Sequence, residues 1–520
     1  MLVYCWKYLI IYNDSHSDRQ AFDPTGATAM IRPILAKTCL CALLVCLGST
    51  LPRTALGADA SDGSAHAPRS GDPFNARRLG AFVDSLMNAE MKREGIPGAA
   101  FVFVRHGRVV TQRGYGWADV SARRAVDPEK TIWRIGSISK TFTATAVMQL
   151  VDSGRIHREA DVNLYLSKVK VPETYPLPVT VTDLLTHTAG LDEVRPGTQG
   201  PSRESVMPLA EFLAPRLVRV RPPGQTISYS TYGITLAGDL VEEVSGKPIE
   251  EYFEANIWRP LGMSRTSINV PVTLAGDVAI GYERRGDSLE AQAWEWYHTT
   301  PASSINSTAA DMARYLMAHL GHGRIGSARV LSEKSSVEML SQQVTMHAKV
   351  PGVTLGFWEG RFGDLRVVEH GGNVAGFSAQ LVMIPSEDAG FFVVSQFENS
   401  KLRDNLEDAL LKHLYPRARV RPVPPAPPPD FSKRGDAYAG NYGPSTSCHS
   451  CKPRSVPYVL EVKHEGDALR IGGSRYVEVA PLLFLREDGG AYLAFRADAS
   501  GAIVEMHPGS FWAFERLPKE

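Results

Sequence analysis

The chain has 520 residues, of which 43% are hydrophobic and 22% charged, a composition typical of globular proteins with room for more than one domain. It has 56 basic and 56 acidic residues, so its charge gives no indication of a nucleic-acid partner or of an anionic membrane surface. This composition excludes a disordered or fibrous protein.

The N-terminal segment predicts export. Met30 begins a basic stretch followed by the apolar run TCLCALLVCLGSTL, which is too short for a comfortable membrane span. Small residues in the following ALGADA offer a cleavage site, so residues 1–57 are predicted to be a leader, with a signal peptide at 30–57 and Met30 as the true start. The alternatives are an uncleaved membrane anchor, which would be the chain's one contact with a membrane, and lipidation at Cys46. Lipidation is disfavoured because Val45 stands where a small residue is usual.

The next elements predict an α+β fold. Residues 58–73 read as a flexible lead-in, and apolar residues then recur at helical spacing between 79 and 87. Two β-branched and aromatic runs flank His106-Gly107 as a hairpin, and strand patterns return at 365–397. The middle of the chain reads as helical pieces with loops. We therefore expect one antiparallel sheet, built from early and late strands, with a helical insertion between its halves.

The C-terminal region is predicted to be a separate small domain. Seven prolines in PRARVRPVPPAPPPD mark a linker over 416–435, which leaves a first domain at 74–415. Short strands with Gly and Asp turns predict a β-sandwich or barrel over 436–520. In the mature chain only Cys448 and Cys451 remain, and a small disulfide in an exported surface loop is favoured over a metal site, which would need about four ligands.

The stretch WRIGSISKTFT carries the strongest chemical signal. Ser137 and Lys140 are three residues apart at the N-terminus of an apolar helix predicted from 138 to 152, so they lie on one face of it. A lysine whose pKa is lowered by burial can take the proton of a serine, and the helix N-terminus favours an oxyanion. Chance occurrence of Ser-x-x-Lys is the alternative. Ser139 should face another way.

These residues, with VTDLLTHTAGL about fifty residues later, resemble the serine beta-lactamase-related family, which includes class C beta-lactamases, D-alanyl-D-alanine carboxypeptidases and related esterases. The resemblance covers about residues 75–415 and implies the fold predicted above. It also implies a nucleophilic Ser137 with Lys140 as its proton partner, and a structural hydrogen bond for His187.

The resemblance places a second element after Pro223-Gly224. Tyr229 would share the proton transfer with Lys140, whereas a core aromatic is the alternative. Thr231 stands where the family usually has Asn, in a position expected to contact substrate. An amide donates and accepts at once whereas a threonine offers one hydroxyl, so efficient beta-lactam hydrolysis is not expected.

The third element is His370-Gly371-Gly372, where the family usually has a cationic residue on an edge strand. A histidine is largely neutral near pH 7, so a substrate carboxylate would be held less firmly than by lysine. Gly371 and Gly372 are expected to leave room for substrate along the strand. The backbone N–H groups of Asn373 and Ser137 are the expected oxyanion donors. An ordinary edge-strand histidine is the alternative for His370.

Two classes of function follow. The first is an exported, periplasmic or secreted serine hydrolase that forms an acyl-enzyme on an ester or peptide-like amide, with no cofactor and no metal. Its substrate would be a small or peptide-like molecule, including peptidoglycan-derived ones, and an esterase or D-amino-acid peptidase is favoured over an efficient beta-lactamase. The second is a non-catalytic envelope protein that binds peptidoglycan. Loss of Ser137, Lys140 or Tyr229 would mark that second class, and all three are present.

Overall fold

The computed structural model describes residues 72–419, 421–453 and 456–518. The predicted leader (1–57) and nearly all of the predicted lead-in lie outside the described residues. Pro73–Glu520 belong to one compact unit. Among the described residues, we find no helix that combines the length and the apolar character needed to cross a membrane.

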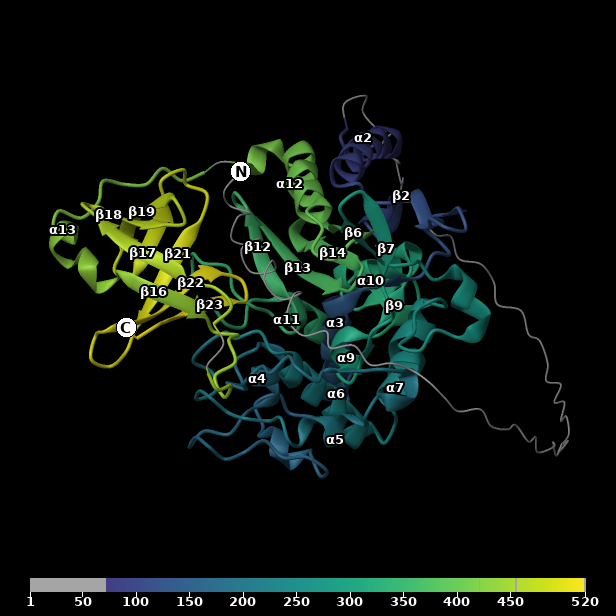
Figure 1. The fold of residues 1–520 in the computed structure, drawn as a ribbon, viewed down its shortest axis with the longest axis horizontal. Coiled ribbons are helices and arrows are strands. Elements are labelled where there is room, and N and C mark those ends of the chain that lie inside the picture. The colour runs from purple at the N-terminus through teal and green to yellow at the C-terminus, as the bar shows by residue number, and fades with distance from the viewer. Residues whose placement is uncertain (1–71, 420, 454–455, 519–520) are drawn as a thin grey trace, which may run out of the picture. The chain divides into compact units, whose positions relative to one another are not determined.

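A seven-stranded antiparallel sheet forms the centre of the larger domain (Figure 1). Its order across the sheet is β12 (Trp358–Phe362), β13 (Leu365–Val374), β14 (Phe377–Ile384), β15 (Ala389–Gln396), β1 (Gly98–Arg105), β2 (Arg108–Asp119) and β3 (Arg124–Ala125). The pairing of β1 with β15 confirms that the early hairpin and the late strands share one sheet. His106 and Gly107 both have positive φ angles, 50° and 66°, which suits the tight turn between β1 and β2.

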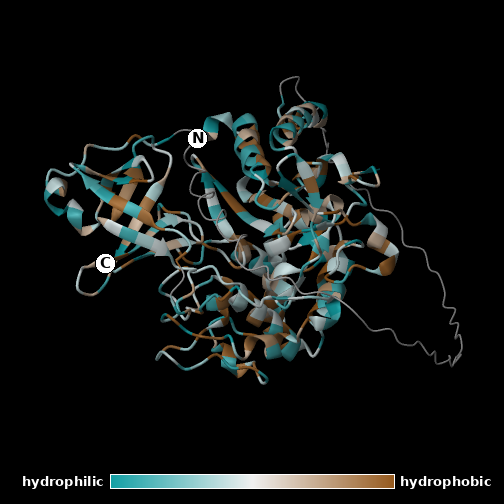
Figure 2. Cartoon of the chain, viewed as in Figure 1, coloured by the Kyte–Doolittle hydropathy of each residue, from teal (hydrophilic) through white to brown (hydrophobic). Residues whose placement is uncertain are grey.

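The sheet is covered on both faces. Along β1, Ala99, Phe101 and Phe103 pack in the cluster that contains α2 and α12, whereas the alternate residues pack in the larger cluster with α3 and α10. Because side chains alternate along a strand, both sets are buried, and β1 reads as a nearly continuous apolar run. Brown and teal residues alternate along α2 and α12, as expected of helices with one apolar face (Figure 2).

The helical insertion predicted between the sheet halves is present, together with short two-stranded ribbons. The α-helices among the described residues are α2 (Ala76–Glu94), α3 (Ser139–Asp152), α4 (Val181–Leu185), α5 (Leu209–Leu213), α6 (Thr231–Ser245), α7 (Ile249–Phe253), α8 (Arg259–Leu261), α9 (Thr300–Ser303), α10 (Ala309–Leu320), α11 (Glu333–Leu340), α12 (Leu402–Leu414) and α13 (Phe431–Arg434). The ribbons pair β4 (Trp133–Arg134) with β9 (Asn306–Ser307), β5 (Gln199–Gly200) with β8 (Trp296–Tyr297), β6 (Tyr282–Arg285) with β7 (Ser288–Ala291), and β10 (Arg324–Ile325) with β11 (Ala328–Arg329).

The C-terminal region forms a closed eight-stranded barrel, so the barrel is the correct one of the two predicted all-β forms. Its strands are β16 (Gly440–Pro444), β17 (Leu460–Glu465), β18 (Ala468–Ile471), β19 (Ser474–Ala480), β20 (Leu483–Arg486), β21 (Tyr492–Ala497), β22 (Ile503–Gly509) and β23 (Trp512–Arg516). The pairing of β16 with β23 closes the barrel, which leaves no unpaired edge. Phe431 of α13, inside the stretch predicted as linker, is fully buried in the barrel core.

Cys448 and Cys451 form the predicted disulfide, between β16 and β17. The loop that carries it is not a free surface loop, which corrects that part of the prediction. The backbone N–H groups of His449 and Ser450 donate to the Asp192 carboxylate, at 2.9 and 2.8 Å. The short Cys-His-Ser-Cys loop therefore binds an acidic residue of the larger domain.

Candidate active site

Ser137 lies in the short 3-10 turn Gly136–Ile138, which leads into α3. Gly136 has a φ of +53° and packs on β13, where a Cβ would meet the backbone N of Asn373 at 2.9 Å. The residues around Ser137 are buried and Ser137 itself is partly exposed, so its hydroxyl is accessible while its backbone is fixed. Ser139 Oγ instead donates to the Gly136 carbonyl at 2.6 Å, so Ser139 faces away, as predicted.

Lys140 is 1% exposed and lies on the first turn of α3. Its Nζ is 3.2 Å from Ser137 Oγ and donates to the Ala302 carbonyl of α9 at 3.0 Å. Burial lowers the pKa of Lys140 to about 7, although the Glu193 carboxylate opposes that shift. A substantial fraction of the amine is therefore neutral at pH 7 and able to accept the serine proton.

Tyr229 precedes α6, and its hydroxyl hydrogen-bonds the Ser137 side chain. Lys140 Nζ lies 5.0 Å from the centroid of the Tyr229 ring. Burial raises the pKa of Tyr229 well above its usual value of 10, so the phenol stays protonated at neutral pH. Ser137, Lys140 and Tyr229 are therefore brought together as predicted, and of the last two Lys140 is the one suited to be the base.

The N-terminus of α6 holds Tyr229 in place. Ser230 is the N-cap residue, and its backbone N–H donates to His187 Nδ1 at 3.1 Å, which is the structural hydrogen bond expected of His187. Burial lowers the pKa of His187 to about 3, so its ring is neutral and can accept that bond. The predicted contact residue Thr231 is the first residue of α6, where its backbone N–H donates to Glu193.

Glu193 is a residue that the sequence did not single out. Its carboxylate accepts hydrogen bonds from Ser230 Oγ at 3.2 Å and from the backbone N–H groups of Thr231 and Tyr232. A carboxylate at a helix N-terminus is stabilised by the helix dipole. Glu193 thus fixes the start of α6, and it also favours the charged form of Lys140.

Replacing Glu193 with glutamine should have two effects. Loss of the charge at the α6 N-terminus should lower the free energy of unfolding by about 1 kcal/mol. It should also lower the pKa of Lys140, because the carboxylate holds that pKa up, so the acid limb of an acylation pH profile should move to lower pH. Denaturant unfolding measures the change in the free energy of unfolding, and acylation rates measured over a pH series give the position of the acid limb. A limb that moves to higher pH would contradict this role for Glu193.

His370 lies on β13 and is fully buried. Its ring packs on Trp358 with centroids 4.1 Å apart, and its Nδ1 is 2.7 Å from the Gly371 carbonyl. Burial, aided by the charge of Lys140, holds the pKa of His370 well below 6.5. A neutral ring that donates from Nδ1 has an Nε2 that can only accept a hydrogen bond, and this buried Nε2 has no partner among the described residues.

The two glycines after His370 pack closely against other parts of the protein. A Cβ on Gly372 would lie 2.0 Å from the Ile135 carbonyl oxygen and 3.1 Å from the Ser137 nitrogen. A Cβ on Gly371 would meet the Gln380 side chain at 2.9 Å. Neither glycine could carry a side chain here without a shift of its neighbours, and room for substrate along this strand stays a prediction. Gly372 lets β13 approach the serine turn and brings Asn373 beside it.

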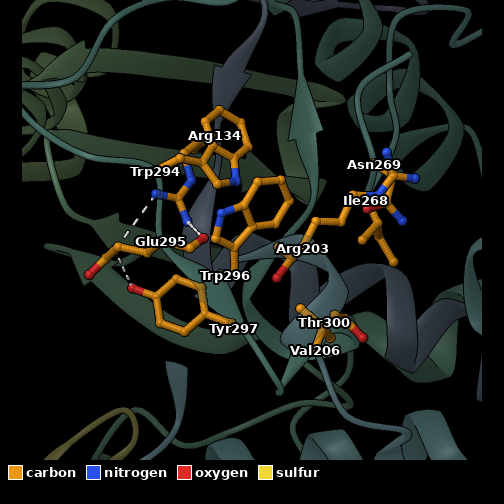
Figure 3. A pocket seen from close by; sticks show the side chains of 11 residues that line it. Arg134, Arg203, Val206, Ile268, Asn269, Trp294, Glu295, Trp296, Tyr297 and Thr300 are labelled. Carbon is orange, nitrogen blue, oxygen red and sulfur yellow. Dashed lines mark hydrogen bonds and ion pairs between the residues drawn. The ribbon is translucent and has the colours of Figure 1, made fainter. Parts of the chain in front are cut away.

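A second feature lies next to the serine turn in the chain. Arg134, three residues before Ser137, lines a small pocket of about 140 Å³ together with Trp294, Glu295 and Tyr297 (Figure 3). The Arg134 guanidinium donates to the Glu295 carbonyl at 2.9 Å and lies 4.8 Å from the Trp294 ring centroid. The pocket thus combines aromatic surface with an arginine that is already paired.

Most of the larger domain matches one known protein family. The sequence profile of the Beta-lactamase family matches residues 83–415. The chain therefore belongs to this family, whose members are usually serine hydrolases.

Two curated proteins are similar in sequence to part of this chain, at low identity. Protein flp of Staphylococcus aureus strain MRSA252 is 23% identical over 350 residues, which cover 64% of this chain and 66% of the relative. The chain therefore spans just under two thirds of that relative's length. The putative penicillin-binding protein PbpX of Bacillus subtilis is 29% identical over 196 residues, covering 38% of this chain and 47% of the relative.

Two solved structures share the fold. The octameric penicillin-binding protein homologue from Pyrococcus abyssi matches with a TM-score of 0.57 and 24% identity, covering 84% of this chain and 99% of that chain. A structure described as SurE matches with a TM-score of 0.60 and 22% identity, covering 84% of this chain and 100% of that chain. Together with the profile, they establish a penicillin-binding, beta-lactamase-like fold followed by the C-terminal barrel.

Proposed function

We propose that this protein is a serine hydrolase that forms an acyl-enzyme on Ser137. One observation carries the proposal: a fully buried lysine amine, with a pKa near 7, lies 3.2 Å from a partly exposed serine hydroxyl. Neutral Lys140 takes the proton as Ser137 Oγ attacks the carbonyl carbon. The backbone N–H groups of Ser137 and Asn373 stabilise the oxyanion, and Tyr229 relays the proton to the departing group. Water then hydrolyses the ester bond to Ser137.

We propose neutral esters or peptide-like amides as the substrates. His370 supports this choice, because burial keeps its ring neutral, so the ring supplies no positive charge to hold a substrate carboxylate. An esterase or D-amino-acid peptidase is thus favoured over an efficient beta-lactamase. Export is part of the proposal, and the Cys448–Cys451 disulfide supports it because such bonds persist in oxidising compartments.

Covalent labelling tests the proposal. The purified mature protein is treated with a fluorophosphonate or with a labelled penicillin, and its intact mass is measured. We expect one fluorophosphonate adduct in the parent and none in Ser137→Ala. Labelling by the fluorophosphonate alone would favour an esterase over a penicillin-binding activity. A folded parent that gives no adduct with either reagent would instead favour the non-catalytic envelope protein.

A further inference from the structure

The C-terminal barrel contacts the chain segment that leads to Tyr229. Arg221 pairs with Glu515 of β23 and donates to the Ser445 carbonyl at 2.5 Å. Thr226 Oγ1 donates to Glu505 of β22 at 2.5 Å. Arg221, Thr226 and Glu505 are buried and Glu515 is half-buried, so water weakens these bonds less than it weakens surface bonds. The loop before the tyrosine is therefore fixed from the barrel side.

The turn between β22 and β23 carries an aromatic residue to the tyrosine itself. The Phe511 ring centroid lies 5.2 Å from that of Tyr229 and 4.3 Å from that of Trp358. Trp358 in turn packs on His370. Phe511 and Tyr229 are both partly exposed, so the two rings form a surface that a bound molecule can meet.

The position of Phe511 is fixed from both domains. Ser510, in a left-handed conformation, donates its N–H to the Pro351 carbonyl at 2.7 Å and its hydroxyl to the Glu359 carbonyl at 2.5 Å. Trp512 packs on Phe511 with ring centroids 4.2 Å apart and rests on the barrel core. Phe511 therefore has little freedom to move aside when a substrate binds.

We propose that Phe511, supplied by the barrel, determines specificity by limiting the size of the leaving group. The inference rests on the proposed function, in which Tyr229 delivers a proton to the departing oxygen or nitrogen, so the leaving group must lie beside the Tyr229 hydroxyl. The Phe511 ring lies against the Tyr229 ring, with centroids 5.2 Å apart, and so occupies space beside it. A leaving group that extends past Tyr229 collides with a ring that cannot move away, whereas a compact one does not.

Paired aryl esters test this inference. Phenyl acetate and 4-biphenylyl acetate share an acyl group and release phenols of similar acidity, so they differ chiefly in length. The readout is the ratio of kcat/KM for the long ester to that for the short ester, with active sites counted by fluorophosphonate labelling of Ser137. We expect Phe511→Ala to raise this ratio by about fivefold or more, because removing the clash favours the long ester alone. Phe511→Trp should lower it.

Tyr458→Ala is the matched control, because Tyr458 packs on Phe514 inside the barrel and reports general damage to that domain. We expect its ratio to equal that of the parent. Equal ratios in the parent, Phe511→Ala and Phe511→Trp, with Ser137 labelled in all three, would overturn the role of Phe511 while leaving the proposed hydrolase intact. A parent that is not labelled at Ser137 would refute the proposed function itself.

Discussion

Replacing Lys140 with methionine should lower the rate of Ser137 acylation by about a thousandfold or more. Methionine keeps the length and the apolar contacts of the side chain but cannot accept a proton, and general-base catalysis contributes about 10²–10⁴-fold. The lost hydrogen bond to Ser137 adds to the effect. Stopped-flow or mass-resolved labelling of the variant and the parent measures the rate. A variant that keeps a tenth of the parent rate would remove Lys140 from the mechanism.

The pH dependence of the parent gives a second measurement. Because burial lowers the pKa of Lys140 to about 7, the acylation rate should fall about tenfold per pH unit below pH 7 and level off above it. The unfolded chain, with a normal lysine, binds this proton more tightly between pH 7 and 10.5. The folded state therefore gains stability as pH rises through that window. Lys140→Met should abolish this contribution to stability.

A buried polar residue on the same helix provides the control for Lys140. Thr145 Oγ1 hydrogen-bonds the Thr141 carbonyl and lies 2.9 Å from the Tyr315 hydroxyl. Thr145→Val should lower stability by about 1 kcal/mol through these lost bonds but leave the pH profile of acylation unchanged. If Lys140→Met and Thr145→Val changed the pH profile of acylation equally, the change would indicate general damage to α3.

Replacing Tyr229 with phenylalanine should lower the acylation rate by about 10²–10³-fold while changing substrate affinity less than about threefold. The ring contacts with Trp358 and Phe511 remain, so the site keeps its shape, but the hydroxyl that bonds Ser137 is lost. Single-turnover kinetics over a range of substrate concentrations separates the two quantities. Equal acylation rates in variant and parent would assign Tyr229 a packing role.

The leaving group adds a further readout for Tyr229. The protonated phenol supplies a proton to the departing atom, and a poor leaving group needs that proton more than a good one. Tyr229→Phe should therefore slow an alkyl ester or an amide far more than a nitrophenyl ester of the same acid. A loss that does not depend on the leaving group would contradict the relay role.

Local sequence was sufficient to predict that Ser137 and Lys140 lie together at the start of a buried helix. Ser137 and Lys140 are one turn apart, so helical geometry alone brings them together, and the absence of a charged face on α3 correctly indicated burial. The pairing of β1 with β15 could also be expected. The strand patterns at the two ends of this domain are apolar, and placing them in one sheet buries both.

Other parts of the site depend on contacts between segments distant in sequence, which no local pattern reveals. The role of Glu193 arises because its loop meets the start of α6, and an acidic residue in a loop is usually only solvated. Phe511 belongs to another domain. The close packing at Gly372 could not be predicted, because the sequence shows that a side chain is missing but does not show which atoms take its place.

The order of the sheet bears on when the protein can become active during its synthesis. The strand that pairs with β1 is β15, the serine turn packs on β13, and Thr226, in the segment that leads to Tyr229, bonds Glu505 of barrel strand β22. A ribosome makes Ser137 long before any of these partners, and domains fold as units once their chain is complete. A nascent chain thus carries Ser137 before the segments that surround it, and under the proposed function the site is complete only after the barrel strands have been made.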